Sequence, residues 1–231
     1  MTPDAVDVAV TDEAGFVARY LDPASRLGEV LFGLIMVLTI TLSEGLTVSE
    51  GPEGVRQLLA AALGCNIAWG FIDAVMYVMN CVTERAEKAY VIHAIREAPD
   101  AAAALDVVRR EVEPRFGALA GEPQTDAVCR AILEYLSRAT PPAPGISRED
   151  VYGAAACFWL VFLSCLPAAL PFLVFSDPHR ALRVSNALLV AMLFVAGQKW
   201  GQYARVSRIV AGAVMVAIGL TLVGVAILLG G

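Results

Sequence analysis

The stretch from Asn66 to Lys88, NIAWGFIDAVMYVMNCVTERAEK, is apolar enough to form a membrane helix but carries an aspartate near its middle. At about 100° per residue, its polar and thioether side chains fall on one side of such a helix. That side comprises Asn66, Gly70, Asp73, Met76, Tyr77, Asn80, Glu84 and Glu87. The opposite side is apolar and suits lipid or neighbouring helices. A charged side chain inside a bilayer costs several kcal/mol, so Asp73 needs an explanation.

The residues alone leave two explanations of Asp73 open. It could hold helices together by packing or capping, or it could belong to an ion or proton pathway. Its neighbours on the stripe have similar alternatives. Met76 could pack in an ordinary core, and Asn80 could line the mouth of a passage or hydrogen-bond another helix. Glu84 and Glu87 could form a solvated face at the exposed end of the helix.

The composition of the whole chain is that of an integral membrane protein. Its 231 residues are 58% hydrophobic with a mean hydropathy of +0.65, and the apolar residues occur in long runs. The sequence has no glycine-rich phosphate loop, nucleophile elbow, HExxH motif or basic groove. We therefore expect no enzyme, no prosthetic group and no nucleic-acid partner. The five cysteines include no CxxC pair and are expected to be small apolar residues in helices.

Five apolar segments predict an all-α fold with five transmembrane helices. The predicted spans are about Leu27–Val48, Arg56–Val82, Val151–Phe175, Leu182–Gln198 and Ile209–Leu229. The first has a short apolar core, so a re-entrant segment is an alternative, although a full span fits the remaining topology. The second has no proline or glycine between Gly70 and Pro99, which favours one continuous helix to about Glu97. In the fifth, Gly212 and Gly219 offer a close helix contact.

The predicted organisation has four parts. They are an N-terminal cytoplasmic or interfacial segment (1–27), the first two transmembrane helices (28–83), a small helical cytoplasmic insert that is a candidate metal-binding domain (84–150), and the last three transmembrane helices (151–231). Within the insert we expect helices at about 101–119 and 125–138, with Pro114 bending or ending the first. Pro167 and Pro171 are expected to bend the third span.

Lysine and arginine predict the orientation of the spans. With the N-terminus and the insert inside the cell, only three of the 17 basic residues lie outside. These exceptions are Arg56, Arg180 and Arg183. Basic residues favour the cytoplasmic side, so we expect a cytoplasmic N-terminus and insert and an external C-terminus.

Three stretches of the sequence have a further likeness. They are MNCVTERAEK (79–88), LSCLPAALPFLVF (163–175) and LFVAGQKWGQYARVSRIVAGAVMVAIG (193–219). Together with five spans and an insert after the second, they make the chain similar to the vacuolar iron transporter family, as a divergent bacterial member. The first is similar to that family's glutamate-bearing helix exit, the second to its proline-bearing third span, and the third to its fourth-to-fifth span region.

The resemblance implies a function and a setting. It implies a multi-pass protein of the bacterial inner membrane that exports Fe²⁺ or Mn²⁺ from the cytosol in exchange for protons. The metal ion would be the transported substrate, the lipid bilayer its surroundings, and a second copy of the chain its partner in a homodimer with the passage near the subunit contact. The alternative is a membrane sensor or scaffold that transports nothing and whose intramembrane carboxylates only hold the bundle together.

The resemblance also implies candidate metal ligands. The family has Asp-Gly early in its first span, where this chain reads Gly28-Glu29-Val30, so Glu29 is the candidate there. In the second span, Asp73 and Met76 occupy the zone of the family's Ser-Met and Gly-Glu-Tyr segments. The full candidate set is Glu29, Met36, Asp73, Met76, Asn80, Glu84 and Glu87. Carboxylates attract hard or borderline cations, and a thioether favours Fe²⁺ over Mg²⁺ or Ca²⁺.

Overall fold

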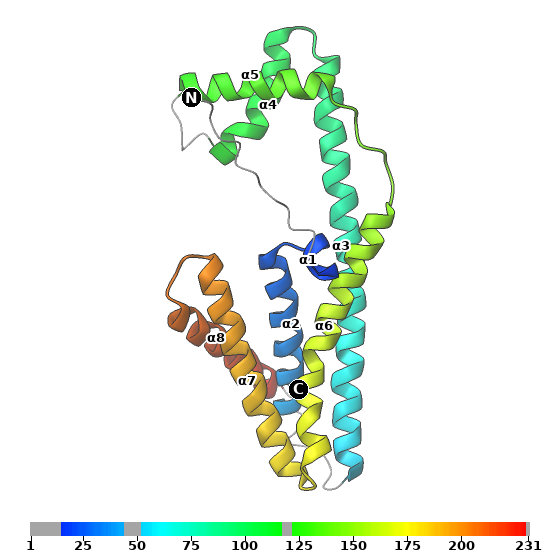
Figure 1. Ribbon diagram of the computed structural model, residues 1–231, viewed down its shortest axis with the longest axis vertical. Helices are drawn as coiled ribbons and strands as arrows, with labels where there is room; N and C mark the ends of the chain where they lie inside the picture. Colours follow the sequence, from blue (N-terminus) through cyan, green and yellow to red (C-terminus); the bar gives the residue numbers. More distant parts are fainter. Residues whose placement is uncertain (1–14, 44–51, 117–121, 230–231) are drawn as a thin grey trace, which may run out of the picture. The chain divides into compact units, whose positions relative to one another are not determined.

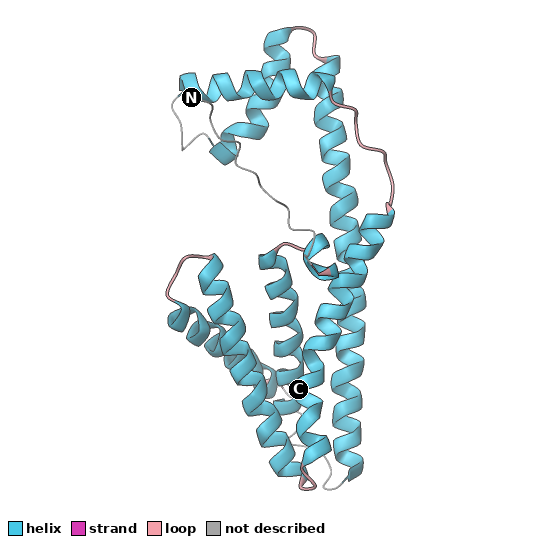
Figure 2. Cartoon of the chain, viewed as in Figure 1, coloured by secondary structure: helices cyan, strands magenta, loops and turns pink. Residues whose placement is uncertain are grey.

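The computed structural model describes residues 15–43, 52–116 and 122–229, and all regular structure in these ranges is helical (Figure 2). Most of the predicted N-terminal segment and the predicted end of the first span, 44–48, therefore lie outside the described residues. The helices are α1 (Phe16–Tyr20), α2 (Pro23–Ser43), α3 (Pro52–Glu97), α4 (Ala101–Phe116), α5 (Glu122–Arg138), α6 (Arg148–Val174), α7 (Pro178–Tyr203) and α8 (Arg208–Leu228).

Five of these helices are long and apolar enough to cross a membrane, namely α2, α3, α6, α7 and α8. This confirms the five apolar helices predicted from the sequence. The single long helix is confirmed too, because α3 runs from Pro52 to Glu97 without a break. Its length follows from the absence of glycine and proline in its second half, since these residues most often interrupt helices.

Several helices begin earlier than the apolar pattern indicated, and in two of them a capping residue outside the apolar run accounts for the start. Asp22 accepts hydrogen bonds from the backbone N–H of Ala24 (2.8 Å) and Ser25 (3.1 Å), so α2 begins at Pro23 instead of Leu27. Asp177 accepts one from His179 N–H (3.1 Å), so α7 begins at Pro178 instead of Leu182. In both helices proline occupies the first position, where its missing N–H costs no hydrogen bond.

The chain divides into two compact units, with boundaries after Tyr77 and before Arg148. The first unit consists of residues 1–77 and 148–231. In it, α2 packs against α6, α7 and α8, and α7 packs against α6 and α8 (Figure 1). Its core consists of Leu34, Val37, Leu38, Ala62, Cys165, Ala168, Leu189, Leu193 and Val223. The short helix α1 lies against α6, where Leu21 is buried with Ala156 and Cys157.

Glycines bring α7 and α8 into close contact. A Cβ placed on Gly212 would lie 2.9 Å from the carbonyl oxygen of Phe194, and one on Gly197 would lie 2.9 Å from the Cα of Gly212. A Cβ on Gly219 would lie 2.5 Å from the side chain of Leu193. The contact predicted for Gly212 and Gly219 is therefore confirmed, and α7 is the helix that makes it.

Two helices contain prolines in their interior, α6 in the first unit and α4 in the second. Helix α6 continues through both Pro167 and Pro171 to Val174. Ser185 of α7 donates a hydrogen bond of 2.7 Å to the carbonyl of Ala168, in the segment between these prolines. In the other unit, α4 contains Pro114 and is described as far as Phe116, so the predicted continuation of this helix to about 119 lies outside the described residues.

The second unit has a small core of its own. Helix α4 packs against α5, and the buried residues are Ile95, Ala104, Val108, Val112 and Cys129. Arg96 donates a hydrogen bond of 2.7 Å to the carbonyl of Ala139, which ties the end of α3 to the residue after α5. Arg109 on α4 forms an ion pair with Asp126 on α5.

Candidate cation site

Helix α3 buries its polar side and exposes its apolar side, the reverse of a helix in a soluble protein. Asn66 and Gly70 are buried and Asp73 is half-buried, whereas Phe71 is 66% exposed. Further large apolar side chains on the outer side are exposed as well: Ile67, Ile72 and Val75. A bilayer accepts such a surface and water does not. Asp73 therefore belongs to an inward-facing strip of α3 inside the apolar bundle, together with Asn66 and Gly70, and we call this strip the polar seam.

The packing of α3 against α6 determines which way this seam faces. A Cβ on Gly70 would lie 3.1 Å from the ring of Phe158, and one on Gly153 would lie 2.3 Å from the ring of Tyr77. The hydroxyl of Tyr77 donates a hydrogen bond of 3.3 Å to the carbonyl of Tyr20. Because Gly70 and Tyr77 flank Asp73 at helical spacing, these contacts turn the Asp73 carboxyl toward the bundle.

The structure brings Glu29 of α2 and Asp73 of α3 together, although they are 44 positions apart in the sequence. Their carboxyl groups lie within hydrogen-bonding reach of each other. A carboxylate can only accept hydrogen bonds, so a bond between them requires a proton on one of the two groups. The buried Oδ2 of Asp73 has no hydrogen-bond partner among the described residues.

Neither carboxyl group is neutralised by a basic side chain. None of the ion pairs formed by the described residues involves Glu29 or Asp73. Two half-buried carboxylates this close repel each other, and a proton or a cation between them relieves the repulsion. Glu29 and Asp73 therefore form a site that can exchange one positive charge for another.

The other predicted ligands do not join this pair. Met36 is half-buried on α2, and Met76 on α3 is 53% exposed. Met76 lies about 60° around the helix from Asp73 and about 100° from Tyr77, on the side away from Tyr77. Asn80, Glu84 and Glu87 are exposed and belong to the second unit.

Among the described residues, no group of three or more His, Cys, Asp or Glu side chains is arranged to hold a metal ion. A cation at the Glu29–Asp73 pair would thus have two protein carboxylates and would complete its shell with neutral ligands. Water, backbone carbonyls and a thioether are all suitable donors for a first-row metal.

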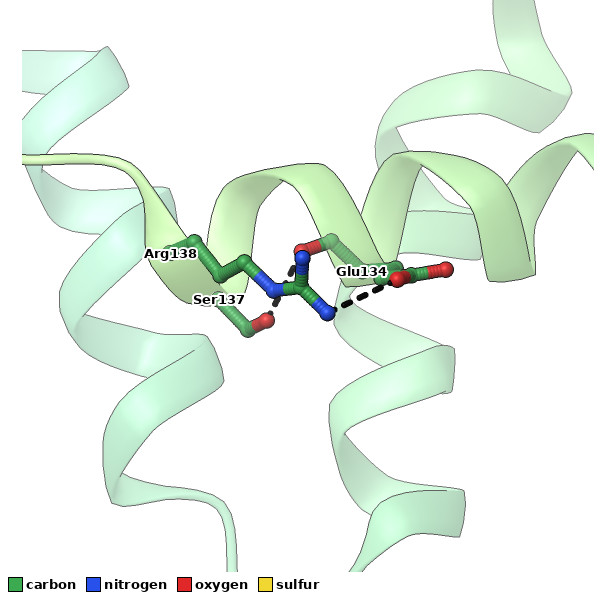
Figure 3. A network of polar contacts seen from close by, with 3 residues as sticks. All are labelled: Glu134, Ser137 and Arg138. Atoms are coloured by element: carbon green, nitrogen blue, oxygen red, sulfur yellow. Dashed lines mark hydrogen bonds and ion pairs between the residues drawn. The ribbon is translucent and has the colours of Figure 1, made fainter.

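Three acidic residues of the second unit are paired with basic ones. Glu84 lies 3.5 Å from Lys88, and Asp126 pairs with Arg109. On α5, Arg138 contacts Glu134 at 2.9 Å, and the hydroxyl of Ser137 donates to the Glu134 backbone carbonyl (Figure 3). The shallow hollow beside this network is lined by Ala131, Glu134, Tyr135, Arg138 and Ala139. Because a cation would have to displace the lysine or arginine, we expect these carboxylates to bind metal only weakly.

This expectation can be tested by replacing Glu84 and Glu87 together with alanine. Titration calorimetry of Mn²⁺ into the purified protein should show that the double variant loses at most a weak component. The principal binding step should remain if the Glu29–Asp73 pair is the main site. Loss of the principal step in Glu84→Ala/Glu87→Ala would place the main site in the second unit instead.

Sequence reasoning missed one polar residue beside this seam, Ser164 on α6. A Cβ on Gly33 would lie 2.0 Å from the hydroxyl oxygen of Ser164 and 3.3 Å from Oδ1 of Asn66. Gly33 shares a helix face with Glu29, and Asn66 lies on the polar stripe of α3, so two of the three were visible from helical spacing. Ser164 was not, because a serine in an apolar helix usually bonds its own backbone.

No protein-family model matches the chain, and no curated protein sequence matches it either. The likeness to vacuolar iron transporters accordingly depends on the residues quoted above.

Proposed function

We propose that this protein is a membrane transporter that exchanges a divalent transition-metal ion, Fe²⁺ or Mn²⁺, for protons and exports the metal from the cytosol. The observation that supports it is the contact between Glu29 and Asp73 on two apolar helices, without a basic partner. An ionisable group inside a membrane segment is costly and usually functional. A metal ion that enters the pair displaces the shared proton, which couples metal movement to proton movement.

The choice of Fe²⁺ or Mn²⁺ rests on the resemblance and on two methionines of the same helices, which the structure does not bring to the carboxyl pair. Two carboxylates attract any divalent cation, including Mg²⁺ and Ca²⁺. Met36 and Met76 are the nearest candidate sulfur ligands along the two helices, and a thioether favours Fe²⁺. Because Met76 is exposed on the outside of α3, a second copy of the chain packed there would enclose it, in keeping with a homodimer.

Cation uptake into proteoliposomes that contain the purified protein tests this proposal. Fe²⁺ and Mn²⁺ should enter faster than Mg²⁺ or Ca²⁺, and a pH gradient that drives protons the opposite way should accelerate entry. If uptake of every cation equals that of protein-free liposomes, the proposed transport function is wrong. The carboxyl pair would then be a proton-bridged link between helices in a sensor or scaffold.

The orientation proposed for this transporter places the N-terminus and the 84–150 insert in the cytoplasm of a bacterial inner membrane. Reporter fusions after Gly54, Thr140, Asp177, Ala204 and Gly231 should report outside, inside, outside, inside and outside. The reason is the concentration of lysine and arginine in the segments assigned to the inside. A cytoplasmic reporter at Gly231 would contradict this topology.

A further inference from the structure

A second polar group on the seam, the side-chain amide of Asn66, lacks part of its hydrogen bonding. Asn66 is completely buried, and its Nδ2 donates a hydrogen bond of 3.1 Å to the carbonyl of Ala62. This bond sets the orientation of the amide, because the opposite orientation would place two acceptor oxygens against each other. Oδ1 of Asn66 has no partner among the described residues, and a buried amide oxygen is costly to leave unpaired.

The hydroxyl of Ser164 reaches the same place from another helix. Ser164 is 7% exposed and donates its proton to the carbonyl of Val161 at 2.7 Å, so the lone pairs of its oxygen remain available. This oxygen and Oδ1 of Asn66 are the two side-chain atoms that a Cβ on Gly33 would meet. Both oxygens thus lie beside the backbone of α2 at Gly33, and the one from Asn66 still lacks a hydrogen-bond donor or a cation.

The position of these oxygens relates them to the carboxyl pair. Gly33 follows Glu29 by one helical turn, about 6 Å along α2, and Asn66 precedes Asp73 by two turns, about 10 Å along α3. The buried residues next along α2 are apolar: Leu34, Val37 and Leu38. The polar seam therefore passes from the carboxyl pair to Asn66 and Ser164 and then meets the apolar core.

We propose that Oδ1 of Asn66 and Oγ of Ser164 form a second, uncharged binding station for the transported divalent cation, deeper in the bundle than Glu29 and Asp73. This inference rests on the proposed function. Neutral oxygens hold a partly hydrated cation more weakly than carboxylates do, which lets the cation leave again. The carboxyl pair attracts the ion and releases the proton, and the uncharged station receives the ion at the end of the polar seam.

Ser164→Ala tests the station, and Ser185→Ala is its matched control. Both serines are buried, and both donate a hydrogen bond of 2.7 Å to a backbone carbonyl. Ser185 joins two helices and lies outside the seam, whereas Ser164 bonds within its own helix. A structural role predicts the larger loss of thermal stability in Ser185→Ala and wild-type flux in both variants.

A binding station at Ser164 predicts a different result for the Mn²⁺ flux of the two variants. Mn²⁺ flux into proteoliposomes should fall about tenfold in Ser164→Ala and stay unchanged in Ser185→Ala, since a barrier raised by one lost ligand changes rates by this order. Equilibrium binding of Mn²⁺ to the purified protein, followed by electron paramagnetic resonance, should stay within about twofold of wild type in Ser164→Ala, because the carboxyl pair is intact.

Asn66→Leu provides a second, independent variant, with Asn186→Leu as its control. The amide oxygen of Asn186 is already bonded by the hydroxyl of Thr41 at 2.7 Å, whereas that of Asn66 is unpaired. Asn66→Leu should fold, because it removes an unpaired buried acceptor, and should lose flux as Ser164→Ala does. If Asn66→Leu does not fold, the Mn²⁺ flux of Ser164→Ala alone tests the station.

Two results would overturn the station and are distinguishable. Wild-type flux in folded Ser164→Ala, with the wild type transporting Mn²⁺, would show that the two oxygens only hold a structural water, and the proposed function would stand. A wild-type protein that transports no cation would remove both the station and the transport function.

Discussion

Asp73→Asn is expected to reduce divalent-cation flux to near the background of empty liposomes while the protein remains folded. Asparagine retains the size and hydrogen-bonding capacity of the side chain but cannot ionise. It removes one of two carboxyl groups that contact each other without a basic partner, so folding should not suffer. The remaining Glu29 can carry a proton but cannot balance a divalent charge alone. The pH dependence of transport should disappear together with the flux.

Glu29→Gln should behave in the same way, because the two carboxyl groups act as one site. Glu53→Gln is a suitable control, since Glu53 lies on the same helix as Asp73 but its side chain is 71% exposed beside Arg56. Flux and thermal stability should be measured side by side on all three variants. If the pair were only a structural link, flux would be normal in whatever protein folds and any loss would follow reduced stability. A stable Asp73→Asn variant with wild-type flux would exclude Asp73 from the mechanism.

Gly212→Leu is expected to have the largest effect on stability. A leucine side chain there meets the Phe194 carbonyl oxygen, which lies 2.9 Å from the Cβ position, and the Phe194 ring at 2.7 Å. The ring can turn away but the backbone cannot, so α7 and α8 must separate. Overpacking of this kind costs about 3 kcal/mol, and the melting temperature in detergent should fall by roughly 10 °C.

Gly224→Leu is the matched control for this prediction. Gly224 lies on the same helix, α8, but beyond its own stretch of that helix no atom of the described residues lies within 4 Å of its Cβ position. The two variants add the same side chain to the same helix, so their difference isolates the contact with α7. Equal melting temperatures for Gly212→Leu and Gly224→Leu would contradict the close packing of α7 and α8.

The helices were predictable from the sequence because they depend on local properties of the chain. Apolar length identifies the five long helices, and the lack of glycine and proline after Gly70 accounts for the continuation of α3 to Glu97. The inward direction of Asp73 was also predictable, since Asn66, Gly70 and Tyr77 share its helix face and the opposite face suits lipid.

The composition of the site was less predictable because it depends on contacts between helices. The resemblance identified Glu29 and the polar stripe identified Asp73, but only the packing of α2 and α3 shows that their carboxyl groups meet. Met76 was grouped with Asp73 because the predicted stripe was drawn wider than the actual contact with α6. Nothing in the sequence around Ser164 marks it as part of a site. It comes close to Asn66 only because Gly33, which lies between the helices, has no side chain.

The proton released when a metal ion binds tests the central claim most directly. Calorimetric titration of Mn²⁺ into the purified protein, repeated in buffers with different ionisation enthalpies, measures the number of protons released per ion. The Glu29–Asp73 pair predicts release of about one proton for each Mn²⁺ bound by the wild type, because the ion replaces the shared proton. The Glu29→Gln/Asp73→Asn double variant should show neither this binding step nor the release. Binding of Mn²⁺ without proton release, or with the same release in the double variant, would contradict the account.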